Sequence, residues 1–319
     1  MEETLRSLTS LPNLQITEHV PLALHTRFGI GGPADALIES TSATSFTAAL
    51  QKVRASQVPF VVIGGGSNLI VADDGFRGIV LKFSGSGICI DGTRAIAEAG
   101  AVLQTLVDAT IAAGLSGIHT MTGVPGWVGA AVYGNAGAYG HSISEFTHTV
   151  RFFDGTEVRA FNNAQCQFHY RESIFKKQKD WIVLSVELDL QPADAAELKS
   201  QADGILNIRN EKYPPTMKCA GSIFKNYLLA ELPPAVAAAL PKNVIREGKV
   251  PSAYFLEQVG AKGLRVGDIH VADYHANLIY NAGHGTARDL VTVIQDLKHR
   301  IESRFGIPLE EEVQYVGRV

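Results

Sequence analysis

The sequence predicts a protein of the α+β class with two or three domains. Helical and strand patterns are interspersed along all 319 residues, a length that allows two or three separate hydrophobic cores. Hydrophobic residues make up 46% and charged residues 19% of the chain, which is typical of a folded globular protein and argues against disorder. Three consecutive glycines at residues 64–66, between two short apolar stretches, add a loop of unusual backbone freedom.

Hydrophobic periodicity locates the main elements. Apolar residues three or four positions apart predict helices at residues 41–57, 101–113, 194–211, 235–240, 252–259 and 286–305. Alternating or short apolar runs predict strands at residues 58–63, 79–83, 149–153, 157–161, 181–190 and 278–280. Asp154 and Gly155 predict a hairpin turn, and the prolines at 214 and 215 mark the expected main domain boundary.

A last strand is expected at the C-terminal end. Two-residue alternation separates its side chains into two faces. One face carries Leu309, Glu311, Val313 and Tyr315, and the other carries Glu310, Glu312 and Gln314.

Charge and cysteine content limit the classes of partner. The net charge is −4 and no basic tract occurs, which argues against nucleic acid or an anionic membrane surface as the main partner. No apolar run reaches the length of a membrane span, and residues 1–6 lack the features of a signal peptide. Three widely spaced cysteines and the absence of His-x-x-x-His or Cys-x-x-Cys pairs predict a cytoplasmic protein without a metal site.

The glycine run and the two residues after it, Gly-Gly-Gly-Ser-Asn at 64–68, are the most informative segment. Glycine backbones let N–H groups approach a ligand closely, so the segment suits a pyrophosphate. Leu69 stands where a dinucleotide fingerprint needs a third glycine, a strand pattern follows, and the P-loop lysine is absent. The sequence therefore predicts a strand–loop–strand phosphate cradle that is neither Rossmann nor P-loop. A glycine-rich hairpin without a ligand is the alternative.

A second glycine-rich segment occupies residues 123–140. Its density of small residues predicts a backbone packed close against something bulky. Ligand contact and tight packing of helices or turns explain this density equally well.

Three polar positions are candidates for chemistry. Arg171 lies among aromatic residues and is suited to bind a carboxylate in a bidentate fork, although most arginines form surface ion pairs. Ser222 follows a glycine, but no Gly-x-Ser-x-Gly elbow surrounds it, so the alternative is a turn residue and a hydrolase nucleophile is not supported. Glu312 fits the solvated face of a strand. Spacing alone does not connect these three positions.

Seven motifs in order resemble one known family. They are HTRFGIGGPAD at residues 25–35, VIGGGSNL at 62–69, GVPG at 123–126, NAGAYG at 135–140, YRES at 170–173, AGSIFKN at 220–226 and FGIPLE at 305–310. Together they resemble the UDP-N-acetylenolpyruvoylglucosamine reductases of cell-wall precursor synthesis. The resemblance extends from residue 21 to residue 317, and the ordered set is far more specific than any single motif.

This resemblance implies a fold and a cofactor. The fold would be a two-part FAD-binding module of the vanillyl-alcohol-oxidase (PCMH) type, followed by a C-terminal α+β substrate domain. The implied parts are residues 1–82, with strand 308–319 returning to them, then 83–205, and then the substrate-binding part 206–307. The implied FAD contacts are Gly64, Gly65, Gly66, Ser67, Asn68, Gly123, Gly126, Ala130, Asn135 and Gly137.

The resemblance also implies a reaction. NADPH would reduce FAD, and a hydride would then pass to the enolpyruvyl C3 of UDP-N-acetylglucosamine-enolpyruvate, with protonation at C2, giving UDP-N-acetylmuramate. Arg171 would offset the negative charge that builds on the carboxylate, and Glu312 would assist as a neutral hydrogen-bond donor. Ser222 would deliver the proton. The implied substrate-binding residues are Tyr139, Lys212, Lys225 and Asn226.

Some positions depart from the family pattern. Trp127 stands where a small hydroxyl residue is usual, Ala130 and Gly134 replace a usual Gly and Met, and Tyr227 replaces a usual Pro. The short stretch between Arg171 and Ser222 resembles the subclass that lacks an inserted tyrosine-bearing loop. Two alternatives stay open: an FAD-dependent alcohol or amine oxidase, and a non-catalytic UDP-sugar-binding or flavin-binding protein. The oligomeric state also stays open, with a monomer as the working hypothesis.

Overall fold

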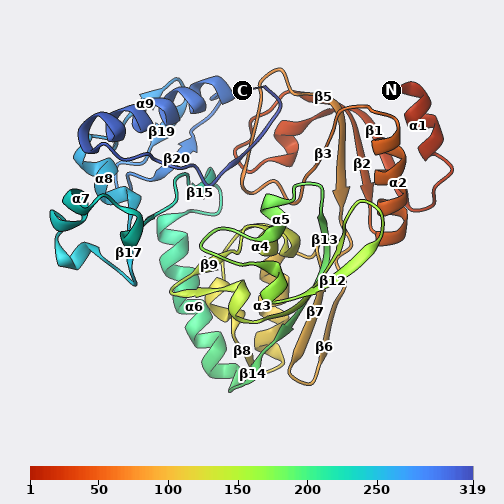
Figure 1. Ribbon diagram of the computed structural model, residues 1–319, viewed down its shortest axis with the longest axis horizontal. Coiled ribbons are helices and arrows are strands. Elements are labelled where there is room, and N and C mark those ends of the chain that lie inside the picture. The colour runs from red at the N-terminus through yellow and green to blue at the C-terminus, as the bar shows by residue number, and fades with distance from the viewer. Residues whose placement is uncertain (319) are drawn as a thin grey trace. The chain divides into compact units, whose positions relative to one another are not determined.

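A computed structural model describes residues 1–318 of the chain and divides them into two compact units, each with its own hydrophobic core. Unit 1 comprises Met1–Val20, Ala34–Gly66 and Arg77–Pro215, and unit 2 comprises the remaining described residues. Both units mix helices and strands, which confirms the predicted α+β class (Figure 1). Unit 1 ends at Pro215, within the pair of prolines that predicts the main boundary.

The first sheet of unit 1 has four strands in the order β1-β2-β5-β3. The strands are β1 (Leu14–Pro21), β2 (Pro33–Ser40), β5 (Phe76–Phe83) and β3 (Phe60–Val62). Helices α1 (Glu2–Leu8) and α2 (Ala43–Ala55) lie beside this sheet and contribute to its core (Figure 1). Helix α2 confirms the helix predicted at 41–57. It begins after Ser42 because the Ser42 hydroxyl caps it, accepting a hydrogen bond from the Ser45 N–H at 3.3 Å.

The second sheet of unit 1 has five strands in the order β12-β11-β13-β7-β6. They are β12 (Val158–Asn162), β11 (Thr147–Phe153), β13 (Ile182–Asp189), β7 (Arg94–Glu98) and β6 (Ile88–Asp91). Strands β11 and β12 pair antiparallel, with Phe153 opposite Val158, which confirms the predicted hairpin. The Asp154 carboxylate accepts hydrogen bonds from the backbone N–H groups of Thr156 and Glu157, at 2.8 and 2.9 Å, and so closes the turn.

Four helices complete unit 1. They are α3 (Leu103–Ala112), α4 (Val128–Tyr133), α5 (Ile174–Lys177) and α6 (Ala195–Lys212). Helices α3 and α4 pack against the five-stranded sheet, and α3 and α6 confirm two predicted helices (Figure 1). Two short ladders join the loops: β8 (Leu115–Ser116) with β14 (Gln191–Pro192), and β9 (Gly137–Ala138) with β10 (His141–Ser142).

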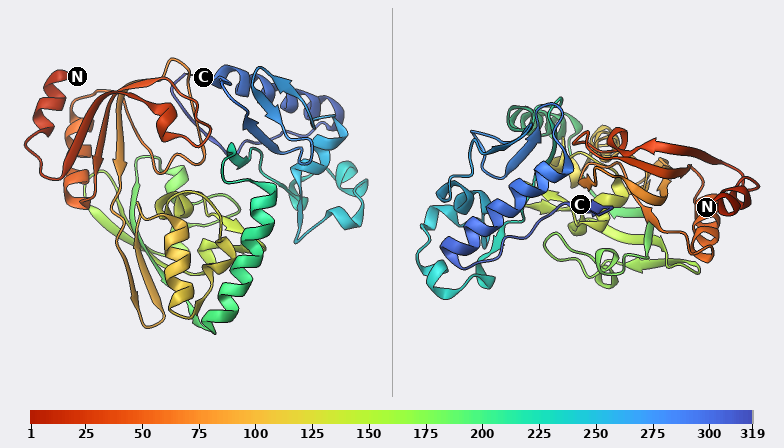
Figure 2. Two further views of the ribbon diagram at one scale, coloured as in Figure 1. Left: turned by 180° about the vertical axis from the view of Figure 1, so that it is seen from behind. Right: turned by 90° about the horizontal axis from the view of Figure 1, so that it is seen from above.

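Unit 2 is built on a four-stranded sheet with the order β15-β20-β19-β18. Its strands are β15 (Lys218–Ser222), β20 (Leu278–Asn281), β19 (Ile269–Val271) and β18 (Arg265–Val266), and a short ladder joins β16 (Tyr227–Leu228) to β17 (Lys249–Val250). Its helices are α7 (Pro234–Ala238), α8 (Ser252–Gln258) and α9 (Ala287–Phe305), all at predicted positions (Figure 2). The Thr286 side chain caps the start of α9, and Gly306, in a left-handed conformation with φ of 65°, ends it.

The C-terminal strand differs from its prediction. Strand β21 covers only Gln314–Val316 and runs parallel to β4 (Leu69–Val71). Leu309 and Val313 are buried as predicted, but Tyr315 is 39% exposed and Val316 is buried instead, so the predicted face is wrong at its end. The reason is a change of partner: residues 310–312 pair with residues 223–225, and the chain turns to β4 only afterwards, which interrupts the two-residue alternation.

Within residues 1–318, no helix is both long enough and apolar enough to cross a membrane. The division at residues 82, 205 and 307 stays a prediction.

Candidate active site

The glycine loop at residues 64–66 follows β3. Strand β3 pairs with β5, whereas β4, the next strand along the chain, pairs with β21. The strand–loop–strand prediction is therefore confirmed, and the hairpin alternative is wrong because β3 and β4 belong to different sheets. The backbone N–H groups of Gly64, Gly65 and Gly66 have no acceptor among residues 1–318. Three adjacent unpaired donors are the arrangement that binds an anion.

The start of helix α4 lies against this loop within unit 1. A Cβ added to Gly64 would lie 3.7 Å from the Ala130 Cβ, so the structure brings these two predicted cofactor residues together. The backbone before α4 is fixed, because the N–H groups of Val128 and Gly129 donate to the carbonyls of Ala101 and Ala99 at 2.9 and 2.8 Å. The glycine loop therefore faces a rigid segment.

Tight packing explains part of the second glycine-rich segment. A Cβ on Gly129 would lie 2.7 Å from the Ala99 Cβ, and a Cβ on Gly137 would lie 2.4 Å from the His141 carbonyl oxygen. Close packing thus requires glycine at both positions, against the Ala99 side chain at Gly129 and against neighbouring backbone at Gly137. Gly123 and Gly126, with φ of 75° and 118°, instead meet a conformational requirement.

Asn135, a predicted cofactor residue, holds loops together. Its Nδ2 donates to the His169 carbonyl at 2.8 Å, and its Oδ1 accepts from the Ser144 N–H at 3.3 Å. Both ends of the amide therefore have protein partners. A cofactor that contacts the Asn135 amide would therefore compete with these two hydrogen bonds.

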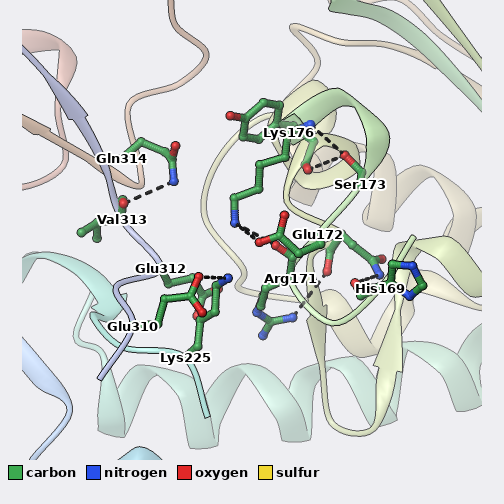
Figure 3. Close-up of polar contacts among 12 residues, drawn as sticks. His169, Arg171, Glu172, Ser173, Lys176, Lys225, Glu310, Glu312, Val313 and Gln314 are labelled. Carbon is green, nitrogen blue, oxygen red and sulfur yellow. Dashed lines mark hydrogen bonds and ion pairs between the residues drawn. The ribbon is translucent and has the colours of Figure 1, made fainter. Parts of the chain in front are cut away.

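Arg171 belongs to unit 1 and is positioned by carbonyl groups (Figure 3). Its Nη2 donates to the Gly137 carbonyl at 2.9 Å and its Nη1 to the Asn135 carbonyl at 3.4 Å. The neighbouring acid, Glu172, pairs with Lys176, at 2.8 Å between Nζ and Oε1. The two carbonyl groups therefore fix the orientation of the Arg171 guanidinium.

Ser222 and Glu312 come together within unit 2. The Glu312 N–H donates to the Ile223 carbonyl at 2.7 Å, and the Lys225 N–H donates to the Glu310 carbonyl at 2.9 Å. The two segments therefore run antiparallel. Glu312 pairs with Ile223, the residue that directly follows Ser222. Figure 3 shows Glu312 and Lys225 on these neighbouring segments. Sequence spacing gave no sign of this pairing.

A buried asparagine fixes the segment that follows Ser222. Asn277 is 2% exposed; its Oδ1 accepts from the Phe224 N–H at 2.9 Å, and its Nδ2 donates to the Phe224 carbonyl at 2.8 Å. The same Nδ2 donates to the Ser252 hydroxyl at 2.7 Å. Sequence reasoning missed this residue, although an asparagine inside the apolar run at 276–280 is a signal that could have found it.

Asn68 connects the end of the glycine run to the segment of Glu312. Its Nδ2 donates to the Glu312 carbonyl at 2.9 Å, and its backbone carbonyl accepts from the Gln314 N–H at 3.0 Å. The structure therefore gives this predicted cofactor residue a role in positioning the backbone at Glu312. Ser67, beside it, is half-buried.

The predicted substrate residues occupy both units. In unit 2, Lys225 is 9% exposed and its Nζ contacts the Glu310 carboxylate, while the Asn226 Oδ1 accepts from the Ser252 N–H at 3.3 Å. In unit 1, Lys212 ends helix α6, and Tyr139 is 47% exposed in the turn between β9 and β10. Lys225 and Asn226 are consecutive residues of unit 2, whereas Lys212 and Tyr139 belong to unit 1.

Tyr227, one of the departures from the family pattern, packs inside unit 2. Its ring centroid lies 5.1 Å from that of Phe255, and among the described residues its hydroxyl has no hydrogen-bond partner. Burial raises the pKa of Tyr227 well above its ordinary value. This side chain therefore contributes packing and stays protonated.

Comparisons with known proteins show which family this chain resembles. Residues 213–316 match the family model of the UDP-N-acetylenolpyruvoylglucosamine reductase C-terminal domain, and residues 34–158 match the FAD binding domain. The chain is similar to the UDP-N-acetylenolpyruvoylglucosamine reductase of Solibacter usitatus (strain Ellin6076), with 60% identity over 97% of this chain and 99% of the relative. It is 35% identical to the reductase of Rubrobacter xylanophilus over 93% of this chain and 94% of the relative. A solved reductase (MurB) from Thermus caldophilus superposes with a TM-score of 0.74 at 29% identity, covering 95% of this chain and all of that one.

Proposed function

The chain belongs to the UDP-N-acetylenolpyruvoylglucosamine reductase (MurB) family of FAD-dependent enzymes in peptidoglycan synthesis, and we propose that Arg171, Ser222 and Glu312 catalyse its reaction. The reaction reduces UDP-N-acetylglucosamine-enolpyruvate to UDP-N-acetylmuramate at the expense of NADPH. The pairing of residues 310–312 with residues 223–225 carries the proposal, because it puts Glu312 beside the segment of Ser222.

The glycine loop fits FAD. Its three unpaired backbone N–H groups suit the pyrophosphate, and we assign this role to Gly64, Gly65 and Gly66, with Ser67 beside them. Ala130, next to Gly64, would border the same group. When bound, FAD would accept a hydride from NADPH and pass a hydride on to C3 of the enolpyruvyl group.

The three catalytic residues divide the remaining work. Hydride addition at C3 pushes negative charge onto the carboxylate, and the Arg171 guanidinium stabilises that charge. Glu312 assists as a neutral donor when its carboxyl group is protonated in a site from which water is excluded. The Ser222 hydroxyl gives a proton to C2, which balances the two-electron reduction, and it recovers a proton from its surroundings.

Other roles complete the proposal. Lys212 and Lys225 supply positive charge to the UDP diphosphate, and Asn226 and Tyr139 contact the substrate. We further expect a cytoplasmic monomer of the subclass without the tyrosine-bearing loop.

Replacing Ser222 by Ala tests the assignment. We expect the variant to bind FAD normally and its turnover to fall by about 10²- to 10⁴-fold, because the proton donor is lost. The measurement is NADPH oxidation with and without the enolpyruvyl substrate, together with the visible spectrum of the purified protein. Ser303→Ala, at an exposed serine on α9, is the matched control. Unchanged turnover in Ser222→Ala would refute the proton-donor role, and a colourless protein that stays inactive with added FAD would refute the flavin site.

A further inference from the structure

The indole of Trp127 lies directly on the glycine loop. A Cβ built on Gly65 would come within 2.9 Å of the Trp127 Cδ1 atom and 3.0 Å of its Nε1 atom. The pyrrole edge of the indole, which carries the N–H, therefore lies where a side chain at position 65 would project, while Gly65 itself stays exposed. Any larger residue at position 65 would collide with it.

The backbone on both sides of Trp127 is fixed. The Gly126 carbonyl accepts from the Leu103 N–H at 3.0 Å, and the Val128 N–H donates to the Ala101 carbonyl at 2.9 Å. Trp127 itself forms an antiparallel bridge with Val102. The backbone that carries the indole is thus fixed beside the loop.

A buried lysine accompanies the indole. The Lys82 Nζ lies 4.8 Å from the centroid of the Trp127 ring, and the residue is 9% exposed. Its nearest acid is Glu39, with 3.9 Å between Nζ and Oε2, which is close to the limit of an ion pair. A buried ammonium normally requires a close anion or several hydrogen-bond acceptors. Lys82 thus brings a weakly compensated positive charge to the ring.

Several donors at this place have no acceptor within residues 1–318. An indole N–H can only donate, and the Trp127 Nε1–H has no acceptor among residues 1–318. The indole lies next to Gly64 and Gly65, and the backbone N–H groups of both, like that of Gly66 after them, also have no acceptor within the described chain. Such a collection of donors, with a cation on the ring, fits an anion with several oxygen atoms.

We propose that Trp127 and Lys82 are ligands of the FAD pyrophosphate in this protein, Trp127 through its Nε1–H and Lys82 through its charge. The proposal rests on the proposed function in one respect, which is that the glycine loop holds the pyrophosphate. It adds two side chains to a site that otherwise consists of backbone groups.

The chain has two tryptophans, so NMR tests the proposal directly. Apo protein labelled with ¹⁵N at the indoles gives two N–H signals, and Trp181→Phe assigns them; this change is conservative because Trp181 stacks on Phe152 at 4.9 Å. The probes are FAD, ADP, which has the diphosphate without the flavin, and riboflavin, which has the flavin without phosphate. We expect the Trp127 signal to move downfield with FAD and ADP but not with riboflavin, because only the first two offer phosphate oxygens.

The outcomes separate this proposal from the one it rests on. If FAD binds and the Trp127 signal stays in place, or moves equally with riboflavin, the indole is not a phosphate ligand. If FAD fails to bind, the flavin site itself is refuted.

Two variants give a second measurement, the dissociation constant of FAD followed by the recovery of flavin fluorescence on release. Trp127→Phe keeps an aromatic ring on Gly65 but removes the donor, and we expect binding to weaken roughly tenfold, as for loss of a hydrogen bond to a charged group. Lys82→Gln should weaken FAD and ADP binding but leave riboflavin binding unchanged. Lys52→Gln, at an exposed lysine of α2, is the control. Unchanged FAD affinity in Trp127→Phe and Lys82→Gln would overturn the proposal.

Discussion

Asn277 is a single residue on which the geometry near Ser222 depends. Replacing it by Ala would leave the N–H and carbonyl of Phe224 and the hydroxyl of Ser252 without their buried partner. We expect the free energy of unfolding to fall by about 2–3 kcal/mol, the range for buried polar groups left unsatisfied, and turnover to fall as well. Urea unfolding measures the first and NADPH oxidation the second. Asn207→Ala, at an exposed position of α6, should change neither, and an equal effect of the two variants would contradict this account.

At the same scale, sequence predicted residue types better than residue partners. A glycine run between two strand patterns predicts a strand–loop–strand arrangement, which the structure confirms, because backbone freedom is a local property. Asn68 and Asn277 act on segments far away in the chain, and no spacing rule reports such contacts. Trp127 appeared in the sequence only as a departure from a pattern. Its place on Gly65 depends on the fixed backbone at residues 101–103.

The β11–β12 hairpin illustrates the scale of an element. Hydrogen bonds to the Asp154 carboxylate, first from the Glu157 N–H and then from the Thr156 hydroxyl and N–H, lower the pKa of Asp154 in the folded state, and Arg159 lowers it further. A carboxylate whose pKa is lower in the folded state stabilises the fold above its unfolded pKa. That contribution is lost as the pH falls toward the folded value.

Asp154→Asn should therefore lower the melting temperature at about pH 7, and the gap to the unsubstituted protein should narrow below about pH 4. Thermal unfolding followed by circular dichroism at both pH values measures this. Asp203→Asn on α6 is a control for the loss of an exposed carboxylate. A gap that stays constant or widens on acidification would show that the carboxylate does not act through its charge.

Elements with local signals were predictable. Helix α9 has an apolar stripe, a capping threonine and a terminal glycine, so its sequence contains its boundaries. Strand β21 has no such markers. The segment before it pairs with residues 223–225, and β21 itself pairs with β4. Hydrophobic periodicity reports only which side chains share a face, so it cannot predict pairing with such distant segments.

For the whole molecule, the prolines at 214 and 215 gave the main boundary, but unit 2 also recruits two short early segments. Phe28, Ile30 and Ile70 belong to its core, and the Asn281 Nδ2 donates to the Phe28 carbonyl at 3.0 Å. Residue spacing did not assign these segments, residues 21–33 and 67–76, to unit 2. They are attached by contacts with residues more than two hundred positions later, such as Asn281 with Phe28 and β21 with β4. The resemblance to a family supplied the cofactor and the reaction, which local patterns could not.

The position of residues 310–316, far along the chain from the segments they pair with, determines when those segments can pair during translation. Chains emerge from the ribosome N-terminus first, so β4 and residues 223–225 must wait for their partners until residues 310–316 have been synthesised. Glu312 arrives with those strands. A product truncated by a late stop codon would therefore carry the glycine loop but neither Glu312 nor β21, and its unpaired strand edges would expose it to proteases and to aggregation. If Glu312 is catalytic as proposed, activity begins only after residues 310–316 have been synthesised and have paired.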